Sequence, residues 1–263
     1  LLLLVSAVLI EVGVQASRQL GAHTRAFEKT GDAASGEAAP IGGSAWAGLT
    51  HALSSPYLLN IAVYMLLYSV LSTFLYFQQA EIVDRTFASR AARTTFFAQV
   101  DLLVNALTLG CQLFLTGRVM KAVGVRVTLS VLPAISAVGF LLLGIMPTAA
   151  IVVGFTVLRR TANFAFARPT REVLFTVVSR EDKYKAKSFI DTVVYRLGDQ
   201  VGAWASSGIA AAGFGPGAIA WAAVPLGLAW VANAGWLGRR QEQGRHGEAG
   251  ARRDEAAVPA AAS

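Results

Sequence analysis

The sequence predicts an all-α protein built as a polytopic membrane helix bundle. Hydrophobic residues make up 54% of the 263 residues, only 15% are charged, and the mean hydropathy is +0.52. Soluble domains are usually about 25% charged. Five segments are apolar over the ~20 residues that a membrane helix needs, and a shortened apolar segment precedes them.

The net charge of +7 does not indicate a nucleic-acid partner. Lys and Arg gather in loops and at helix ends, as they do in membrane proteins whose positive loops stay in the cytoplasm. No soluble segment combines a basic stripe with stacking aromatic residues. The first partner that the composition implies is therefore the lipid bilayer.

Residues 1–17 are interpreted as the end of a transmembrane helix. Residues 1–14 are apolar but too short to span a membrane, and Glu11 and Gln15 indicate the exit into water. Residues 18–55 are rich in Gly, Ala and Ser and lack an apolar period, so they predict a solvated cytoplasmic linker. Such a long linker is uncommon within one compact unit, so we expect it to join two halves of a larger protein whose helix is truncated here.

A five-helix transmembrane bundle is expected over residues 56–237. Its first helix, at 57–79, follows Pro56, whose missing N–H costs nothing at a helix start. Polar or aromatic side chains recur on this helix every four residues: Asn60, Tyr64, Tyr68, Ser72 and Tyr76. Such a stripe forms either a packing surface with interfacial tyrosines or the wall of a cavity.

The next helix, expected at 94–116 after a loop of mixed charge at 81–93, carries a polar stripe. Its members share one helical face: Asp101, Asn105, Thr108 and Gln112. Polar groups inside a membrane must meet other helices or water. For Asp101, interhelical hydrogen bonding and cavity lining are both open, whereas hydrogen bonding is favoured for the other three.

A basic loop at 117–126 precedes the helix expected at 127–146. Pro133 predicts a kink in that helix. Gly139 and Gly144 permit close packing against a neighbour.

The last apolar span is expected at 218–237, and the polar, Ala-rich tail at 238–263 is expected to be disordered. The positive-inside rule assigns the linker, the basic loop, the turn at 180–187 and the tail to the cytoplasm. Every second loop agrees with this orientation.

Two charged helices between residues 151 and 201, joined by a turn at 179–183, are the candidate functional centre. An ionised group inside a bilayer costs on the order of 3 kcal/mol, so such groups face a protein interior, a wet cavity or one another. Five arginines and three acids lie in the pair, which leaves two positive charges after pairing: Arg159, Arg160, Arg168, Arg171, Arg196, Glu172, Asp191 and Asp199. Because guanidinium groups bind carboxylate or phosphate in a bidentate manner, this excess favours an anionic substrate.

Helix geometry also predicts which charges pair. In a hairpin that turns near Glu181, residues equally far from the turn lie at similar depth, and residues three or four apart are neighbours on one helix. Four pairs follow: Arg171 with Asp191, Arg160 with Asp199, Arg196 with Asp199, and Arg168 with Glu172.

We divide the candidate residues into two sets. Those expected to contact a substrate are Arg159, Arg160, Asn163, Arg168, Tyr64 and Asp101. Those expected to form gating charge pairs are Arg171, Glu172, Asp191, Arg196 and Asp199. A salt-bridge gate is favoured for Arg171 with Asp191, which lie near the turn, and substrate binding is favoured for Arg159 and Arg160 near mid-membrane.

Sequence motifs of enzymes are absent. The chain has no phosphate-loop pattern, no Gly-x-Ser-x-Gly and no His-Glu-x-x-His. His23, His51 and His246 lie in expected loops or the tail, and the single Cys111 can form neither an internal disulfide nor a thiol cluster. We therefore expect no enzymatic activity, no metal site and no cofactor.

The layout of a truncated helix, a long linker and five further spans resembles the C-terminal half of a major facilitator superfamily transporter. Residues of the basic loop resemble that family's loop motif, with Lys121 in place of its Asp: Gly117, Arg118, Gly124 and Arg126. The runs from Ala167 to Lys187 and from Phe189 to Arg196 resemble the bacterial branch of the ATP:ADP antiporter, or nucleotide-exchange, family. That similarity is densest over residues 159–204.

The resemblance implies one half of a twelve-helix transporter of the bacterial inner membrane. It implies alternating access, a substrate site between two halves, an N-terminal half as partner, and nucleotide as a possible anionic solute. Antiport and proton-coupled symport both stay open. The alternative is a non-transporting membrane receptor or scaffold, in which the intramembrane charges only pack helices.

Overall fold

The computed structural model describes residues 10–17, 55–178 and 180–257, in two units. The unit Leu1–Gly42 contains a helix at residues 10–17, inside the expected helix end. Residues 18–54 of the expected linker lie outside the described residues. The second unit, Gly43–Ser263, holds the remaining described helices.

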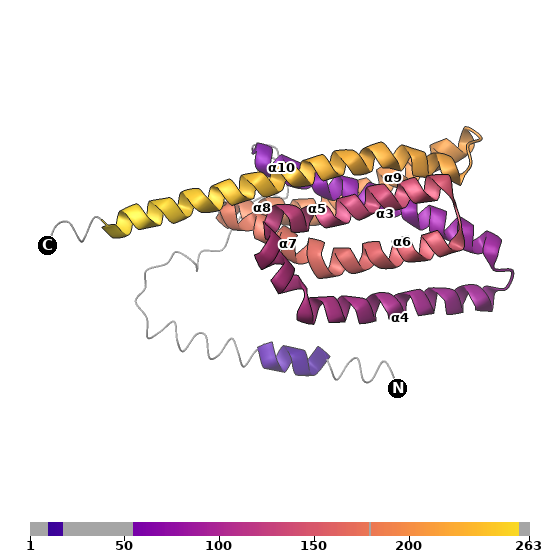
Figure 1. The fold of residues 1–263 in the computed structure, drawn as a ribbon, viewed down its shortest axis with the longest axis horizontal. Coiled ribbons are helices and arrows are strands. Elements are labelled where there is room, and N and C mark those ends of the chain that lie inside the picture. The colour runs from indigo at the N-terminus through magenta and orange to yellow at the C-terminus, as the bar shows by residue number, and fades with distance from the viewer. Residues whose placement is uncertain (1–9, 18–54, 179, 258–263) are drawn as a thin grey trace. The chain divides into compact units, whose positions relative to one another are not determined.

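The second unit is a helix bundle, shown in Figure 1. Its elements are α3 (Pro56–Thr86), α4 (Arg90–Phe114), α5 (Thr116–Ile145), α6 (Ala149–Ala162), η1 (Asn163–Ala167), α7 (Arg168–Leu174), η2 (Phe175–Val177), α8 (Arg180–Phe189), η3 (Ile190–Val194), α9 (Tyr195–Ala211) and α10 (Pro216–Ala257). The described residues contain no strand, and five of their helical segments are long and apolar enough to cross a membrane. The predicted fold class, a polytopic helical membrane bundle, is confirmed.

Two of the long helical rods are composite. One runs from α6 through η1 and α7 to η2, and the other runs from α8 through η3 to α9. The five apolar segments are α3, α4, α5, Ala149–Val177 and Gly217–Arg245, so the α8–α9 rod is not among them. The described part of residues 56–257 therefore forms six long rods: α3, α4, α5, α10 and these two composite rods, which correspond to the two charged helices expected between residues 151 and 201.

The helices extend further than the sequence predicts. The expected loop at 81–93 is reduced to residues 87–89. Within the last turns of α3, Arg85 donates to the Glu81 carboxylate (2.5 Å). At the start of α4, the Ser89 hydroxyl accepts a backbone N–H of the first turn (3.1 Å). These local interactions stabilise both helix ends in place of a loop.

The expected basic loop at 117–126 is also helical and belongs to α5. The helix breaks only at Gly124, whose φ of 78° is readily adopted by glycine, and it runs through Pro133 without a second break. After the break, the backbone N–H of Arg126 donates to Glu242 of α10 (3.4 Å). This contact satisfies one of the N–H groups that a new helix start leaves free.

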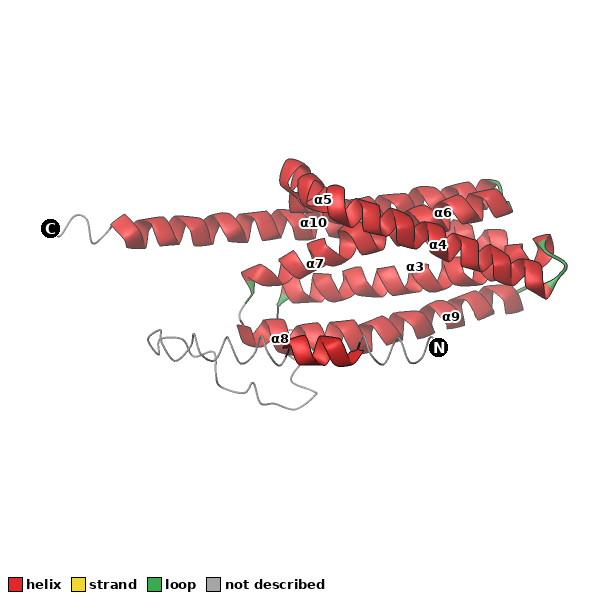
Figure 2. Ribbon diagram, turned by 90° about the horizontal axis from the view of Figure 1, so that it is seen from below, coloured by secondary structure: helices red, strands yellow, loops and turns green. Residues whose placement is uncertain are grey.

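The expected disordered tail at 238–263 differs from the structure as far as Ala257, because α10 continues as one helix to that residue. Figures 1 and 2 both show α10 projecting beyond the other labelled helices of the bundle. The extension is rich in Ala, Arg, Glu and Gln, which are strong helix formers. Its Gln241 is fully buried. Residues 258–263 lie outside the described residues.

Helix α3 forms the centre of the core, where it packs against α9, α10 and α6. The approach of α9 depends on Gly198 and Gly202, since a Cβ there would lie 2.7 Å from the Ser69 Cβ and 2.9 Å from the Thr73 Cβ. The Gly-x-x-x-Gly spacing is a known device for such close helix contacts in membranes.

The close packing predicted at Gly139 and Gly144 of α5 is confirmed. A Cβ on Gly139 would overlap the Phe155 ring, and one on Gly144 would lie 3.1 Å from the Trp221 ring. These glycines therefore let α6 and α10 approach α5 closely.

Candidate functional site

The rod that carries most of the arginines contains a π-helical turn, η1. In this turn the N–H of Arg168 donates to the carbonyl of Asn163, five residues earlier. Pro169 follows directly and has no N–H to donate to the carbonyl of Ala165, four residues earlier. Single π turns of this kind occur often at functional sites.

Two side chains from neighbouring helices satisfy the carbonyls of the π turn. The Thr116 hydroxyl of α5 donates to the Ala165 carbonyl (2.8 Å), and the Gln112 amide of α4 donates to the Phe164 carbonyl (3.1 Å). A backbone acceptor inside a membrane needs such a partner. The π turn is thus stabilised by side-chain hydrogen bonds from α4 and α5.

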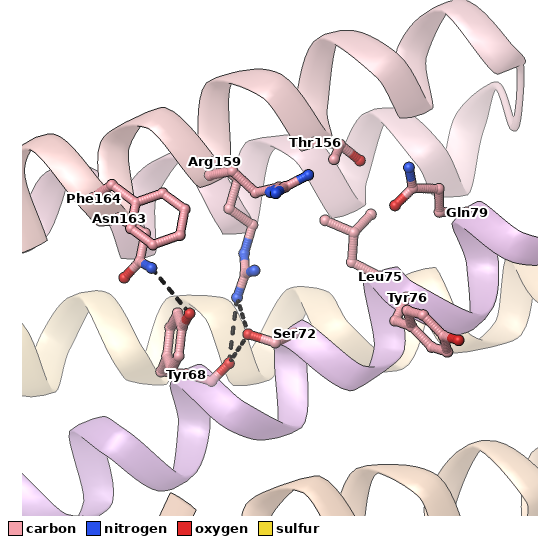
Figure 3. A pocket seen from close by; sticks show the side chains of 10 residues that line it. Tyr68, Ser72, Leu75, Tyr76, Gln79, Thr156, Arg159, Asn163 and Phe164 are labelled. Atoms are coloured by element: carbon pink, nitrogen blue, oxygen red, sulfur yellow. Dashed lines mark hydrogen bonds between the residues drawn. The ribbon is translucent and has the colours of Figure 1, made fainter. Parts of the chain in front are cut away.

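Arg159 of α6 is buried among neutral groups. It is 4% exposed, and its guanidinium donates to the hydroxyls of Ser136 (3.1 Å) and Ser72 (2.9 Å) and to the Tyr68 carbonyl (3.3 Å). Figure 3 shows the side chain reaching from its helix to Tyr68 and Ser72 on α3. Among the described residues, no carboxylate lies within ion-pair distance of Arg159. Its charge is therefore solvated by hydroxyls and a carbonyl but not neutralised.

A cavity of about 260 Å³ lies beside this arginine. It is lined by Tyr68, Ser72, Leu75, Tyr76, Gln79, Thr156, Arg159, Arg160, Asn163 and Phe164. The Thr156 hydroxyl is buried without a hydrogen-bond partner, and the Asn163 amide donates to the Tyr68 hydroxyl (3.0 Å; Figure 3). The cavity therefore combines two cations with neutral hydrogen-bonding groups and aromatic rings.

Arg160 pairs with Asp101 of α4, so its predicted pairing with Asp199 is wrong. Both side chains are partly open to solvent, at 39% and 55% exposure. Val100 and Val104 of α4 pack against Val157 of α6, so this exposed ion pair adds to an apolar contact between the two helices.

Asp199 instead lies against α3. Its carboxylate accepts from the hydroxyls of Ser69 (2.5 Å) and Thr73 (3.4 Å), and its predicted partner Arg196 lies 3.8 Å away. Equal depth along the two rods did not identify the contacts of Asp199. The close contact of Gly198 with α3 turns this face of α9 toward α3.

The predicted contact between Arg171 and Asp191 is present. The two charged groups lie 3.4 Å apart, although the Asp191 Oδ1 atom has no hydrogen-bond partner. Arg171 donates to the sulfur of Met65 (2.7 Å), and its Nε atom has no partner. The pair is an electrostatic contact without hydrogen-bond geometry, so it is weaker than a hydrogen-bonded ion pair.

The predicted pairing of Arg168 with Glu172 is wrong. Glu172 pairs with Lys187 of α8 (2.5 Å), while the Arg168 guanidinium lies 4.6 Å from the centre of the Phe164 ring. Local spacing on one helix was therefore outweighed by a lysine from the adjoining helix. Arg168 lies next to the cavity through its contact with the lining residue Phe164.

Tyr64, expected at the substrate site, lies in the core. It is 2% exposed, donates to the Leu129 carbonyl (3.3 Å) and packs 5.1 Å from the ring of Trp230. Of the five-member polar and aromatic stripe on α3, the members that reach the cavity are Tyr68, Ser72 and Tyr76. The sequence already contained a sign of this difference between Tyr64 and the cavity residues. Residues four apart drift slowly around a helix, so successive members of the stripe face different neighbouring helices.

The described residues contain no cluster of three or more His, Cys, Asp or Glu side chains that could hold a metal ion. In the Arg159 cavity, the groups that could hold a ligand are the two arginines and the neutral polar groups around them.

Over 182 residues the chain is 26% identical to ADP,ATP carrier protein 2 of Chlamydia pneumoniae. The chain is similar to a carrier protein. The matched region covers 60% of this chain and 33% of that protein, so the chain spans about a third of the length of the relative it matches. No family model matches the chain, and no solved structure matches it.

Proposed function

We propose that this chain forms one half of a secondary transporter of the major facilitator type, in which Arg159 and Arg160 bind an anionic solute. The observation that carries the proposal is Arg159, a buried arginine beside a cavity, with no carboxylate partner among the described residues. A buried, unpaired charge is costly. An anion entering the cavity would offset that cost.

The cavity chemistry favours a phosphate or carboxylate. Guanidinium groups form short, strong, bidentate hydrogen bonds with both anions. The unpartnered Thr156 hydroxyl supplies a further donor, and the rings of Tyr68, Tyr76 and Phe164 offer surfaces against which a base could stack. Together with the similarity to an ADP,ATP carrier, this supports exchange of ATP and ADP as the specific activity.

The cavity alone is small for a nucleotide. Sites for drug-sized ligands usually measure about 300–1,000 Å³, against about 260 Å³ here. In an alternating-access transporter the substrate lies between two bundles, and a second half would complete the site. The greater length of the matched carrier leaves room for such a half.

The charge pairs near the turn serve as gates in this proposal. The Arg171–Asp191 and Arg196–Asp199 contacts are 3.4 and 3.8 Å long and partly exposed, so rocking of the halves could break and remake them. We place the turn and the C-terminal extension in the cytoplasm, from the distribution of positive charge. We place the protein in the bacterial inner membrane, from its similarity to a bacterial carrier.

Reconstitution of the full-length protein into liposomes tests the proposal. Labelled ATP should accumulate only when the vesicles contain ADP or ATP, and replacement of Arg160 by Ala should reduce this uptake. A response to a pH gradient without internal nucleotide would indicate symport instead. Absence of flux for nucleotides, phosphate and dicarboxylates alike would contradict a transport function.

A receptor or scaffold is the second candidate, because Arg159 also joins three helices through Ser72 of α3 and Ser136 of α5. In that case the charges only pack helices. An exchange of Arg171 with Asp191 should then preserve thermal stability and biological activity together, and no solute should cross. Loss of transport with retained stability in the exchanged variant would favour the transporter.

A further inference from the structure

A second basic site lies on the outside of the bundle, in a groove of about 440 Å³ between α5 and α10. Its lining combines two arginines, one hydroxyl and small apolar residues: Arg126, Val127, Ser130, Val231, Ala232, Gly235 and Arg239. None of these residues lines the Arg159 cavity. The groove is therefore separate from the cavity proposed to bind the solute.

Close helix contacts create this groove. A Cβ on Gly238 would overlap the backbone of Arg126, and a Cβ on Gly227 would lie 3.0 Å from the Cα of Ala137. These contacts draw α10 against α5. Gly235, between them in the sequence, has open space where its Cβ would be, which leaves room for the groove.

The two arginines bring like charges to one place without an acidic partner. Arg239 donates from Nε to the Gly235 carbonyl (3.2 Å), and no described carboxylate lies within ion-pair distance of either guanidinium. Glu242 approaches, but its Oε1 atom accepts the backbone N–H of Arg126 (3.4 Å). The free guanidinium nitrogens can therefore accept an anion from outside the chain.

The groove lies at an end of the membrane-spanning part of the bundle. α5 and the segment Gly217–Arg245 are both candidate spans. Directly after the groove-lining residues Gly235 and Arg239 come Trp236 and Arg240, and the Arg240 guanidinium lies 5.5 Å from the centre of the Trp236 ring. Tryptophan and arginine gather at the level of lipid headgroups.

An exposed apolar path leads away from the arginines along α5. Val127, Ala134, Val138 and Leu142 follow one another at helical spacing, and all four are exposed. The last three also line a largely apolar groove between α5 and α6. Ala134 lies about 12 Å along the helix from Arg126, comparable with the ~15 Å depth of one leaflet. An acyl chain anchored at the arginines would therefore reach this groove.

We propose that the groove binds an anionic phospholipid, with its phosphate between Arg126 and Arg239 and an acyl chain along the exposed face of α5. Basic pockets between transmembrane helices bind such headgroups. The apolar path distinguishes a lipid from a free phosphate, which would use only the arginines.

Native mass spectrometry of the purified full-length protein tests the proposal, with dioleoylphosphatidylglycerol as the probe and dioleoylphosphatidylcholine as the neutral comparison. Each arginine contributes about 1 kcal/mol to anionic-lipid binding. Replacement of either Arg126 or Arg239 by Gln should therefore weaken phosphatidylglycerol binding about fivefold, and the double replacement about thirtyfold. The control is Arg90→Gln, an exposed arginine at the start of α4 and outside the groove, which should bind as the wild type does.

The proposal is supported if the wild type binds phosphatidylglycerol preferentially, the single variants bind it more weakly, and the double variant binds it most weakly. Equal binding of both lipids, or full binding by the double variant, overturns it. Glycerol phosphate and inorganic phosphate provide a further comparison, because competition by either at the lipid's own concentration would identify a free-anion site instead. The two single variants keep the test decisive if the double variant unfolds.

Discussion

Asp101 competes with an incoming anion for Arg160, so neutralisation of Asp101 should tighten anion binding. In the structure the Asp101 carboxylate pairs with the Arg160 guanidinium. The Asp101 side chain is 55% exposed and the Arg160 side chain is 39% exposed. Exposed ion pairs are worth about 0.2–1 kcal/mol. An incoming phosphate must displace this pair, so Asp101→Asn should raise the affinity for ATP by up to about fivefold.

Isothermal titration of ATP into the purified full-length protein measures this change. The matched control is Glu81→Gln, which breaks another exposed carboxylate–arginine pair, with Arg85 of α3, at residues that do not line the cavity. Affinity should rise in the first variant and stay constant in the control. Unchanged or weaker ATP binding by Asp101→Asn would refute the competition, because Asp101 would then be either remote from the anion or one of its ligands.

Two further predictions concern how the bundle is held together. Gly202→Ala should lower the unfolding temperature, because the new Cβ would lie 2.9 Å from a side chain of α3. The control is Gly208→Ala, on the same helix with open space around it, which should leave the unfolding temperature unchanged. Equal unfolding temperatures of the two variants would argue against the close contact. Thr116→Val should cost about 0.6–1.7 kcal/mol of stability, since the Ala165 carbonyl would lose its donor. Thr94→Val, whose hydroxyl bonds only within its own helix, is the control, and identical unfolding of both variants would contradict a supporting role for Thr116.

Composition and helix periodicity predicted the architecture well because spanning a membrane constrains a chain strongly. Apolar runs of spanning length identified the helices, and Gly139 and Gly144 predicted close contacts that the structure contains. The helix ends were harder to predict. Polar residues such as Glu81 and Arg85 indicated a loop, yet helix pairs of this kind also extend a helix into water.

Between the two charged rods, charge pairing was predictable only near the turn. Close to a hairpin turn, depth alone nearly determines which residues meet, and Arg171 does lie beside Asp191. Farther away, the rotation of each helix about its axis matters as much as depth. Arg160 therefore pairs with Asp101, and Asp199 contacts Ser69 of α3. Gly198, which lets α9 approach α3 closely, was the sequence feature that could have indicated the second contact.

Arg159 was expected to contact a substrate, and this stays a prediction. The structure places Arg159 in the wall of a cavity, without a carboxylate partner among the described residues. The hydroxyls that hold it could not be predicted. Ser72 and Ser136 lie on different helices, far apart in the sequence, and only the folded bundle brings them to one guanidinium.

Equilibrium binding of ATP to an Arg159→Gln variant tests the central claim most directly. Loss of a buried charge that pairs with an anion costs about 2 kcal/mol or more, so affinity should fall at least about thirtyfold. Arg85→Gln, which removes an exposed arginine of α3, should bind normally, and Arg159→Lys provides a second variant that keeps the charge. A folded Arg159→Gln protein that binds ATP and every tested anion as tightly as the wild type would contradict the account.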